Sequence, residues 1–445
     1  LQVQQLAPAI AGTFEKVERA RFDPVLFASG AVARERTQEV SRATGTAFET
    51  EGQEGEMAVG VAKEFPTGTR VEGGVEYDRS YSDRTPDQHD VRGFVSLTQA
   101  LLRGRGTAVN LARVDQAHLE ELVSQEELRG FVLALVAETE RAAWDLAQAT
   151  RQIEIFEGSL QLADRQLAEG EARVQVGAVA ETELVAMKAE VAVRKQALIG
   201  ARARHDRLRM DLLRLLNPGG AWGREVTVSD DPRIAPVPLE PVADHAALAV
   251  KSRPEVAEAR LRLEQGRLEV VRTKNGLLPR LDFFVAYGKT GFADSFSGSV
   301  ESLNEPTYDL SFGLSFERPF GNRERKALHD RATFSTEQER LSIENLVEVV
   351  EWDVQKAYVE VRRAEQQIEA SAATVELQEE VVRVEEEKFR VGKSTGLLVA
   401  QAQRDLLVSQ IANVDAIVDY RKALIELYRM DGSLLERRGV LLPTG

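Results

Sequence analysis

The chain lacks several features that would point to common classes of protein. It has 445 residues and no cysteine, which excludes disulfides, thiol nucleophiles and thiolate metal sites. No stretch approaches the roughly 18 apolar residues of a transmembrane helix. The strands of a membrane barrel alternate in polarity and never form such runs, so a membrane barrel stays possible. With 57 basic against 72 acidic residues, the formal net charge is −15. This excess of acid argues against a general nucleic-acid binder, which must neutralise phosphates.

Proline is also missing from two long ranges of the chain. None of the fourteen prolines lies in residues 87–217 or 320–442. Both ranges consist mainly of Ala, Glu, Leu, Arg, Gln and Val, most of which are good helix formers. Apolar residues recur at three- and four-residue steps, as in Leu128, Val132 and Leu135. Each range therefore predicts helices far longer than a globular domain holds, as in a coiled coil or a helical tube.

The two proline-free ranges align with each other as an internal repeat. The segment ARVQVGAVAETELVAMKAE from Ala172 matches KFRVGKSTGLLVAQAQRD from Lys388, with a Val-Gly pair in each. Glycine ends helices readily because it adopts positive φ without strain. Each range therefore predicts a long helix, a turn at the Val-Gly pair, and a second helix that runs back.

Strand-like segments precede each expected helical pair. In Tyr308–Glu317, leucine and phenylalanine alternate with small or polar residues, which is the period of a strand with two different faces. Leu281–Gly288 is its expected partner. The residues alone also permit a small soluble antiparallel sheet. In the first half, the expected strands are Pro24–Ala33, Met57–Phe65, Thr69–Tyr77 and Val91–Gln99.

Together these segments resemble the TolC-type outer-membrane efflux channels. The resemblance is carried by RPEVAEARLRLEQGRLEVVRTKNGLLPRLDFFVAYG from Arg253, by TQALLRG from Thr98, by ARFDPVLFASGAV from Ala20 and by the duplicated Val-Gly turns. It spans nearly the whole chain. It implies a mainly α-helical protomer with a β-barrel portion, in which long antiparallel helical hairpins form a periplasmic tube. Three protomers would share one transmembrane barrel, with four strands from each.

The resemblance and the repeat predict a definite organisation of the chain. The stretch between Phe22 and Leu102 is twice as long as Leu281–Phe320. The additional strands, Met57–Phe65 and Thr69–Tyr77, either join the barrel or decorate it, and we expect a decoration. The first repeat is expected at 1–216, with a short helix, strands at about 22–99, and a helical hairpin at about 104–216 whose turn is at 176–178. A proline-rich linker at 217–246 separates it from the second repeat at 247–432. The second repeat has a helix at about 247–276, strands at about 281–318, and a helical hairpin at about 321–431 whose turn is at 391–394, and a tail follows at 433–445.

The same resemblance implies a function without chemistry or a cofactor. It suggests a homotrimeric exit duct in the outer membrane that extends into the periplasm, and that carries solutes delivered by an inner-membrane pump through a periplasmic adaptor protein, in tripartite efflux or type I secretion. No nucleic acid is expected as a partner. The residues expected at the adaptor-contacting turns are Val176, Gly177, Ala178, Val391, Gly392, Lys393, Ser394 and Thr395.

The resemblance also suggests where a periplasmic constriction would lie. Many members of the family carry acidic residues after the Val-Gly turn. Here Leu398 and Gln401 are uncharged, whereas Glu181 and Glu183 follow the first turn. An acidic ring would therefore have to come from the first repeat.

A soluble scaffold and an enzyme are the two alternative classes of function. A soluble coiled-coil scaffold or an adaptor-like protein with a small β-domain shares the long helices, but its sheet needs no apolar outer face about 25 Å tall. An enzyme has no supporting constellation, since neither a nucleophile elbow nor a glycine-rich dinucleotide loop is present. The histidines stand alone in the sequence, and we expect surface or structural roles for them rather than metal binding: His89, His118, His205, His245 and His329.

Overall fold

The computed structural model describes residues 2–177, 180–216, 226–228 and 236–441. These residues form two compact units, each drawn from both halves of the chain. One contains residues 2–125 and 258–342 and holds the β-sheet, and the other, which is helical, contains the described residues of 126–257 and of 343–441. Among the described residues, no helix combines the length and the apolar character needed to cross a membrane.

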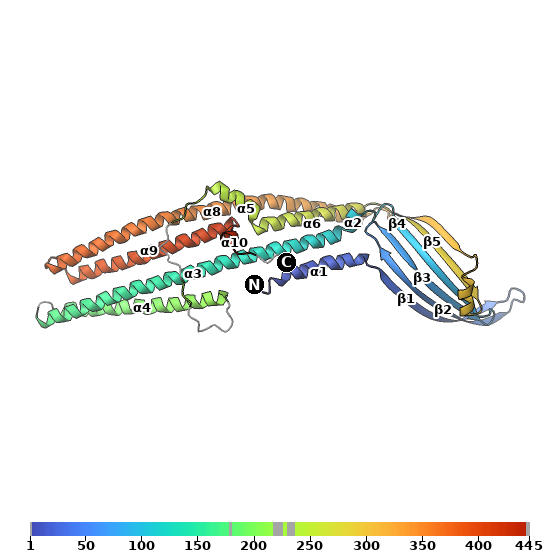
Figure 1. Cartoon of the computed structure of the whole chain (residues 1–445), viewed down its shortest axis with the longest axis horizontal. Coiled ribbons are helices and arrows are strands. Elements are labelled where there is room, and N and C mark those ends of the chain that lie inside the picture. The colour runs from blue at the N-terminus through green and yellow to red at the C-terminus, as the bar shows by residue number, and fades with distance from the viewer. Residues whose placement is uncertain (1, 178–179, 217–225, 229–235, 442–445) are drawn as a thin grey trace. The chain divides into compact units, whose positions relative to one another are not determined.

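The first unit is built on a six-stranded antiparallel sheet in which each strand pairs with its neighbours in sequence (Figure 1). Helix α1 (Leu6–Arg19) and a short 3₁₀ turn, Ala20–Phe22, precede the sheet, and α7 (Phe296–Ser302) lies between its last two strands. The short helix α2 (Thr107–Asn110) follows the fourth strand. The strands are β1 (Val25–Val40), β2 (Ala47–Glu64), β3 (Thr69–Ser82), β4 (Gln88–Ala100), β5 (Arg280–Ala293) and β6 (Asp309–Glu317).

The additional strand pair lies inside the sheet, so the expectation of a decoration is wrong. Strands β2 and β3 lie between β1 and β4, and β1 pairs with β2 from Val25 opposite Ala62 to Val40 opposite Ala47. Their connection is a tight turn in which Gly68 has φ +85° and the Phe65 N–H donates to the Thr69 carbonyl over 2.8 Å. A turn this short keeps both strands in one antiparallel ladder. The chain therefore forms six strands of one sheet where the resemblance implied four.

Two long helical hairpins dominate the other unit. Helix α4 (Glu181–Leu216) runs back beside α3 (Ala112–Gln175), and α9 (Gly396–Met430) runs back beside α8 (Arg323–Arg390) (Figure 1). The helix expected at 247–276 is two helices, α5 (Val242–Ser252) and α6 (Pro254–Gly276). The break arises because a proline disfavours helical dihedrals in the residue before it. Arg253, which precedes Pro254, is accordingly extended, with φ −69° and ψ 129°.

A narrow seam of small and branched residues holds the helical unit together. On α8 the buried positions are spaced alternately by four and three residues, which is the spacing of a coiled-coil seam. They pack with buried residues of α3, α5 and α9 and with Leu434 of the short helix α10 (Leu434–Arg437). The buried α8 positions are Val350, Val354, Ala357, Val361 and Ala364.

Candidate functional site

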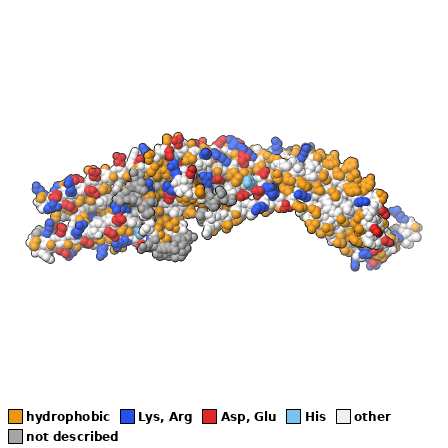
Figure 2. Space-filling view, viewed as in Figure 1, with side chains coloured by type: hydrophobic (Ala, Val, Ile, Leu, Met, Phe, Trp, Pro, Cys, Tyr) orange, Lys and Arg blue, Asp and Glu red, His pale blue; other side chains and the backbone are white. Residues whose placement is uncertain are grey.

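The sheet has one face that is apolar along its middle. Residues that pair across an antiparallel ladder point to the same face, so one row can be followed from strand to strand. The apolar face is defined here by Leu26, Val59, Val61, Val71, Val75, Val95, Leu97, Phe283, Val285, Tyr287, Leu310, Phe312, Leu314 and Phe316. On β6 these side chains are strongly exposed, with Phe312 72% accessible. Figure 2 shows the apolar side chains gathered over the sheet.

Charged residues on the apolar face lie toward the ends of the strands, as at Lys63, Arg79 and Lys289. The Lys63 ammonium group lies 5.2 Å from the centre of the Phe65 ring. A lysine at such a place can keep its charge in water while its methylene stem covers apolar surface. The apolar face therefore forms a band bordered by charge.

The charged residues on the opposite face of the sheet, here called the polar face, are mainly acidic. Arg92 on β4 donates to Asp309 on β6 over 2.8 Å and lies 3.4 Å from Glu76 on β3. The Arg92–Asp309 pair crosses β5 at Gly288, where a Cβ atom would lie 2.5 Å from the Asp309 Oδ1 atom. Glycine at this position therefore leaves the space that the ion pair occupies. The acidic residues of this face include Glu54, Glu56, Glu72, Glu76, Asp78, Asp90 and Asp309.

The sheet ends in two open edges within the described part of the chain. Strand order runs from β1 to β6, so each of these strands pairs on one side. An open edge exposes unpaired N–H and C=O groups, and hydrocarbon cannot satisfy them. The sheet thus has an exposed apolar face and two edges able to accept another strand.

The two Val-Gly pairs lie in the turns between the long helices. Gly177 and Gly392 both have φ +76°, and a Cβ atom on either would meet nothing within 4 Å. After α8, the Lys393 N–H donates to the Lys388 carbonyl over 2.8 Å, which closes a Schellman-type helix end. Val176 and Val391 are exposed beside the glycines, and Ala178 lies outside the described residues.

Side chains near the second turn fix how α9 begins. Thr395 is the N-cap of α9, and its hydroxyl accepts from the Leu398 N–H. The Ser394 hydroxyl donates to the Glu385 carboxylate over 2.8 Å, and the Lys388 ammonium donates to the same carboxylate. These contacts account for the polar residues of the Gly-Lys-Ser-Thr sequence at this turn.

The two hairpins contact each other close to the turns. Met187 of α4 packs against Gly170, where a Cβ atom would lie 2.4 Å from its sulfur, and its methyl group reaches toward Gly396 of α9. The Arg173 guanidinium lies 5.6 Å from the centre of the Phe389 ring, which joins α3 to α8. The structure thus brings the two expected contact turns into one neighbourhood.

The residues expected at a constriction all lie on the returning helices. Glu181 and Glu183 are in the first turn of α4, where the helix dipole favours acidic side chains. Leu398 and Gln401 are near the start of α9. All four side chains are exposed.

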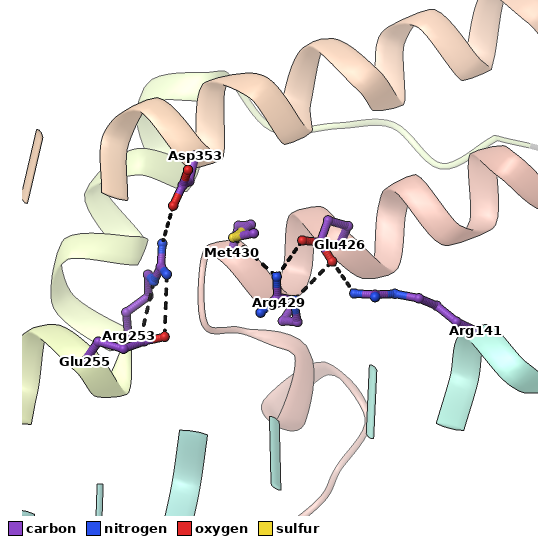
Figure 3. A network of polar contacts seen from close by, with 7 residues as sticks. All are labelled: Arg141, Arg253, Glu255, Asp353, Glu426, Arg429 and Met430. Carbon is purple, nitrogen blue, oxygen red and sulfur yellow. Dashed lines mark hydrogen bonds and ion pairs between the residues drawn. The ribbon is translucent and has the colours of Figure 1, made fainter. Parts of the chain in front are cut away.

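A polar network farther along the hairpins was not found from the sequence. It consists of two groups of contacts, one that joins α8 to the break between α5 and α6 and one that joins α3 to α9 (Figure 3). The Arg253 guanidinium lies 3.5 Å from the Asp353 carboxylate, and Glu426 accepts from Arg429 over 2.6 Å and also from Arg141. The residues of this polar network are Arg141, Arg253, Glu255, Asp353, Glu426 and Arg429. They are scattered along the chain, so no local motif marks them.

Further polar contacts join α3 to α9 on the side of this network nearer the turns. The side-chain amides of Gln148 and Gln152 both donate to Asp415, over 2.5 Å and 2.8 Å, and Lys422 pairs with Asp145. Beyond Asp415 a cavity of about 530 Å³ opens between the hairpins, with Ile155 and Val414 among its lining residues. The polar contacts therefore hold the hairpins together where this cavity ends.

Substituting Glu426 should change how stability depends on pH. Burial alone would raise the pKa of Glu426, but the Arg429 and Arg141 guanidiniums outweigh it and hold that pKa below the ordinary value of 4.5. The carboxylate therefore stabilises the fold above about pH 4.5, and this contribution is lost as pH falls through the lowered pKa. At pH 7, Glu426→Gln should lower the free energy of unfolding, measured with urea, by about 1–2 kcal/mol.

The difference between wild type and Glu426→Gln should shrink on acidification below pH 4.5. The matched control is Glu360→Gln, which removes an exposed ion pair with Arg363 on α8 and should have a smaller effect. An equal loss in both variants at pH 7, or a difference that is the same at every pH, would contradict the role of Glu426.

Comparisons with known proteins agree with this geometry. Residues 246–433 match the family described as "Outer membrane efflux protein". No curated protein matches the sequence. Similar solved structures include a membrane protein from Pseudomonas aeruginosa (17% identity, TM-score 0.70, 97% of this chain and 88% of that one). Two others are the open state of the Neisseria gonorrhoeae MtrE outer membrane channel (16%, 0.67, 98% and 86%) and the Campylobacter jejuni CmeC outer membrane channel (12%, 0.66, 97% and 82%).

These matches confirm the resemblance found in the sequence. It is confirmed by sequence over residues 246–433 and by fold over nearly the whole chain. At such low identities the solved structures establish the fold alone. The function of this chain must be inferred from its own residues.

Proposed function

We propose, from the match of residues 246–433 to the outer membrane efflux protein family and from the channel fold of the chain, that this protein is one protomer of an outer-membrane exit duct. The duct performs no chemistry. It offers a water-filled path to solutes that an inner-membrane pump delivers through a periplasmic adaptor, in tripartite efflux or type I secretion. Its sheet lies in the outer membrane and its helices extend into the periplasm.

The two-faced sheet is the observation that carries this proposal. Exposed side chains such as Phe312 and Leu314 would be unfavourable in water over so large a patch, whereas hydrocarbon accepts them. The polar face, with Arg92 and Asp309 paired across it, suits a wet lumen. A single face of each kind on six consecutive strands is the pattern of a membrane barrel wall.

Closure of the barrel requires other copies of the chain. Strands β1 and β6 are open edges, and they can pair with β6 and β1 of neighbouring protomers. Three protomers of six strands each would supply eighteen strands, a size at which a barrel encloses an aqueous channel. We therefore propose a homotrimer.

The soluble coiled-coil alternative explains the helices but not the sheet. A soluble sheet buries its apolar face under other elements of its own chain. In the described residues, α7 covers the apolar face near Tyr77 and Gly291, through the Phe296 ring and the Ser299 carbonyl. Most of the face, including all of its β6 residues, stays exposed.

Purification and electrical recording test the proposal directly. The full chain should require detergent, sediment as a trimer and form discrete conducting channels in a planar lipid bilayer. A monomer that stays soluble without detergent and never conducts would support the scaffold alternative instead.

We also propose that the two turns contact the adaptor. They carry small residues at exposed helix ends, which allows close approach of a partner's backbone. Gly177→Val and Gly392→Val should each weaken adaptor binding about tenfold, because a β-branched residue at positive φ costs roughly 1–2 kcal/mol and remodels the turn. Binding of the full-length protein in detergent to its adaptor can be measured by surface plasmon resonance.

The matched control is Gly200→Val, in the interior of α4, where a Cβ atom also meets open space. It should leave adaptor binding unchanged, and all three variants should form trimers. Wild-type binding and export in both turn variants would remove the turns from the contact site.

We propose in addition that the exposed Glu181 and Glu183 supply the acidic charge of a periplasmic constriction, since Leu398 and Gln401 are uncharged.

A further inference from the structure

Among the described residues, one cluster of side chains that could ligate a metal ion lies away from the faces of the sheet and from the helical turns. In the sheet-containing unit, α1 contributes Glu15, and α3 contributes His118 and Glu121. One ligand atom from each residue lies within 4.8 Å of the other two. The His118 Nδ1 atom is 3.1 Å from the Glu15 Oε2 atom. Three side chains from two helices thus place possible ligand atoms close together.

Local geometry on both helices favours this convergence. His118 and Glu121 are three residues apart on α3, so they share one face of that helix. Gly12 lies on α1 opposite Glu121, and a Cβ atom there would come within 3.0 Å of the Glu121 Cδ and Oε2 atoms. Glycine inside a helix is unfavourable by about 1 kcal/mol relative to alanine. At this position it leaves room for the Glu121 carboxylate against α1.

The two oxygens of the Glu15 carboxylate have different neighbours. Arg19 donates to Oε1 over 2.6 Å, which leaves the Oε2 atom directed at His118. One oxygen is thus held in place by the arginine while the other faces the cluster.

We propose that Glu15, His118 and Glu121 bind a divalent transition-metal ion, with Zn²⁺ as the best fit. One imidazole nitrogen and two carboxylate oxygens are ligands that zinc accepts, with water in the remaining position. The ion would join α1, which leads into β1, to α3, which follows β4. This site is independent of the proposed export function, because it lies on neither the turns nor the faces of the sheet.

Metal titration of the full-length protein in detergent tests the site. After chelation and removal of the chelator, isothermal titration with Zn²⁺ should show one saturable site per protomer. His118→Asn, Glu121→Gln and Gly12→Ala should each weaken Zn²⁺ binding at least tenfold, the last because its Cβ atom displaces the Glu121 carboxylate. X-ray absorption of the zinc-loaded wild type should show one imidazole ligand.

The matched control is Glu120→Gln. Glu120 is next to Glu121 but accepts from the Gln265 side chain over 2.9 Å and lies outside the cluster, so Zn²⁺ affinity should be unchanged. Absence of saturable binding to the wild type would overturn the proposal. Wild-type affinity in His118→Asn would do the same. If the variants fail to fold, a wild-type absorption spectrum without an imidazole ligand decides against the site.

Discussion

Phe312→Arg should prevent stable insertion of the protein into lipid, whereas Ser311→Arg, one residue away, should be tolerated. Phe312 is 72% exposed on the apolar face, in the row that it shares with Val285 and Leu97. An arginine on the lipid-facing side of a barrel costs about 2–4 kcal/mol near the bilayer midplane. In the proposed trimer, each of three protomers would carry the substitution, so the loss would be repeated three times in one barrel.

Ser311 is the matched control because it points to the polar face. The two variants therefore add the same charge to opposite faces of the sheet. Folding into lipid vesicles can be followed by the resistance of the barrel to urea and to heat on a gel. If both arginine variants insert equally well, or if both fail equally, the apolar face does not contact lipid and the exit-duct proposal loses its main support.

Asp431→Ala should lower the free energy of unfolding of the helical unit by about 3–5 kcal/mol, the usual loss when one partner of a buried pair is removed. Asp431 is fully buried directly after α9, and its Oδ2 atom lies 2.7 Å from the Nδ1 atom of buried His245 on α5. Its Oδ1 atom accepts from the Ser433 N–H over 2.8 Å. Alanine would leave both groups without this acceptor.

The pair can be separated from general effects by a double-mutant cycle. His245→Ala and the double variant should show that the two losses do not add, because the residues are in contact. Asp419→Ala removes an exposed acid from α9 and should change stability by no more than about 0.5 kcal/mol. Urea unfolding in detergent measures all four variants. A loss below about 1 kcal/mol for Asp431→Ala would mean that the pair does not hold α5 to the end of α9.

The helices were predictable because their signals are local. Absence of proline and a repeating apolar stripe act between residues three or four apart, which is the range over which a helix is formed. The turn glycines were predictable for the same reason, since a helix end needs positive φ at one residue. The internal repeat itself stays a prediction.

The strands were predictable only where their two faces differ in polarity. The apolar alternation of Leu310 to Phe316 marks β6 closely, and the structure has it at Asp309–Glu317. β1 continues past Ala33 to Val40, through a segment whose alternate residues are polar on both faces. No periodic signal exists there, and pairing with β2 is what extends the strand. The same pairing placed β2 and β3 inside the sheet.

By itself the sequence determined the type of each long element, the two turns and the two-faced character of the strands, because each depends on neighbouring residues. Tertiary structure alone decided which distant side chains meet. Glu15 and His118 are 103 residues apart, and His245 and Asp431 are 186 apart, so each looked like an isolated residue in the sequence. Such pairs depend on how helices pack, and packing is set by the summed contacts of the whole chain rather than by any local pattern.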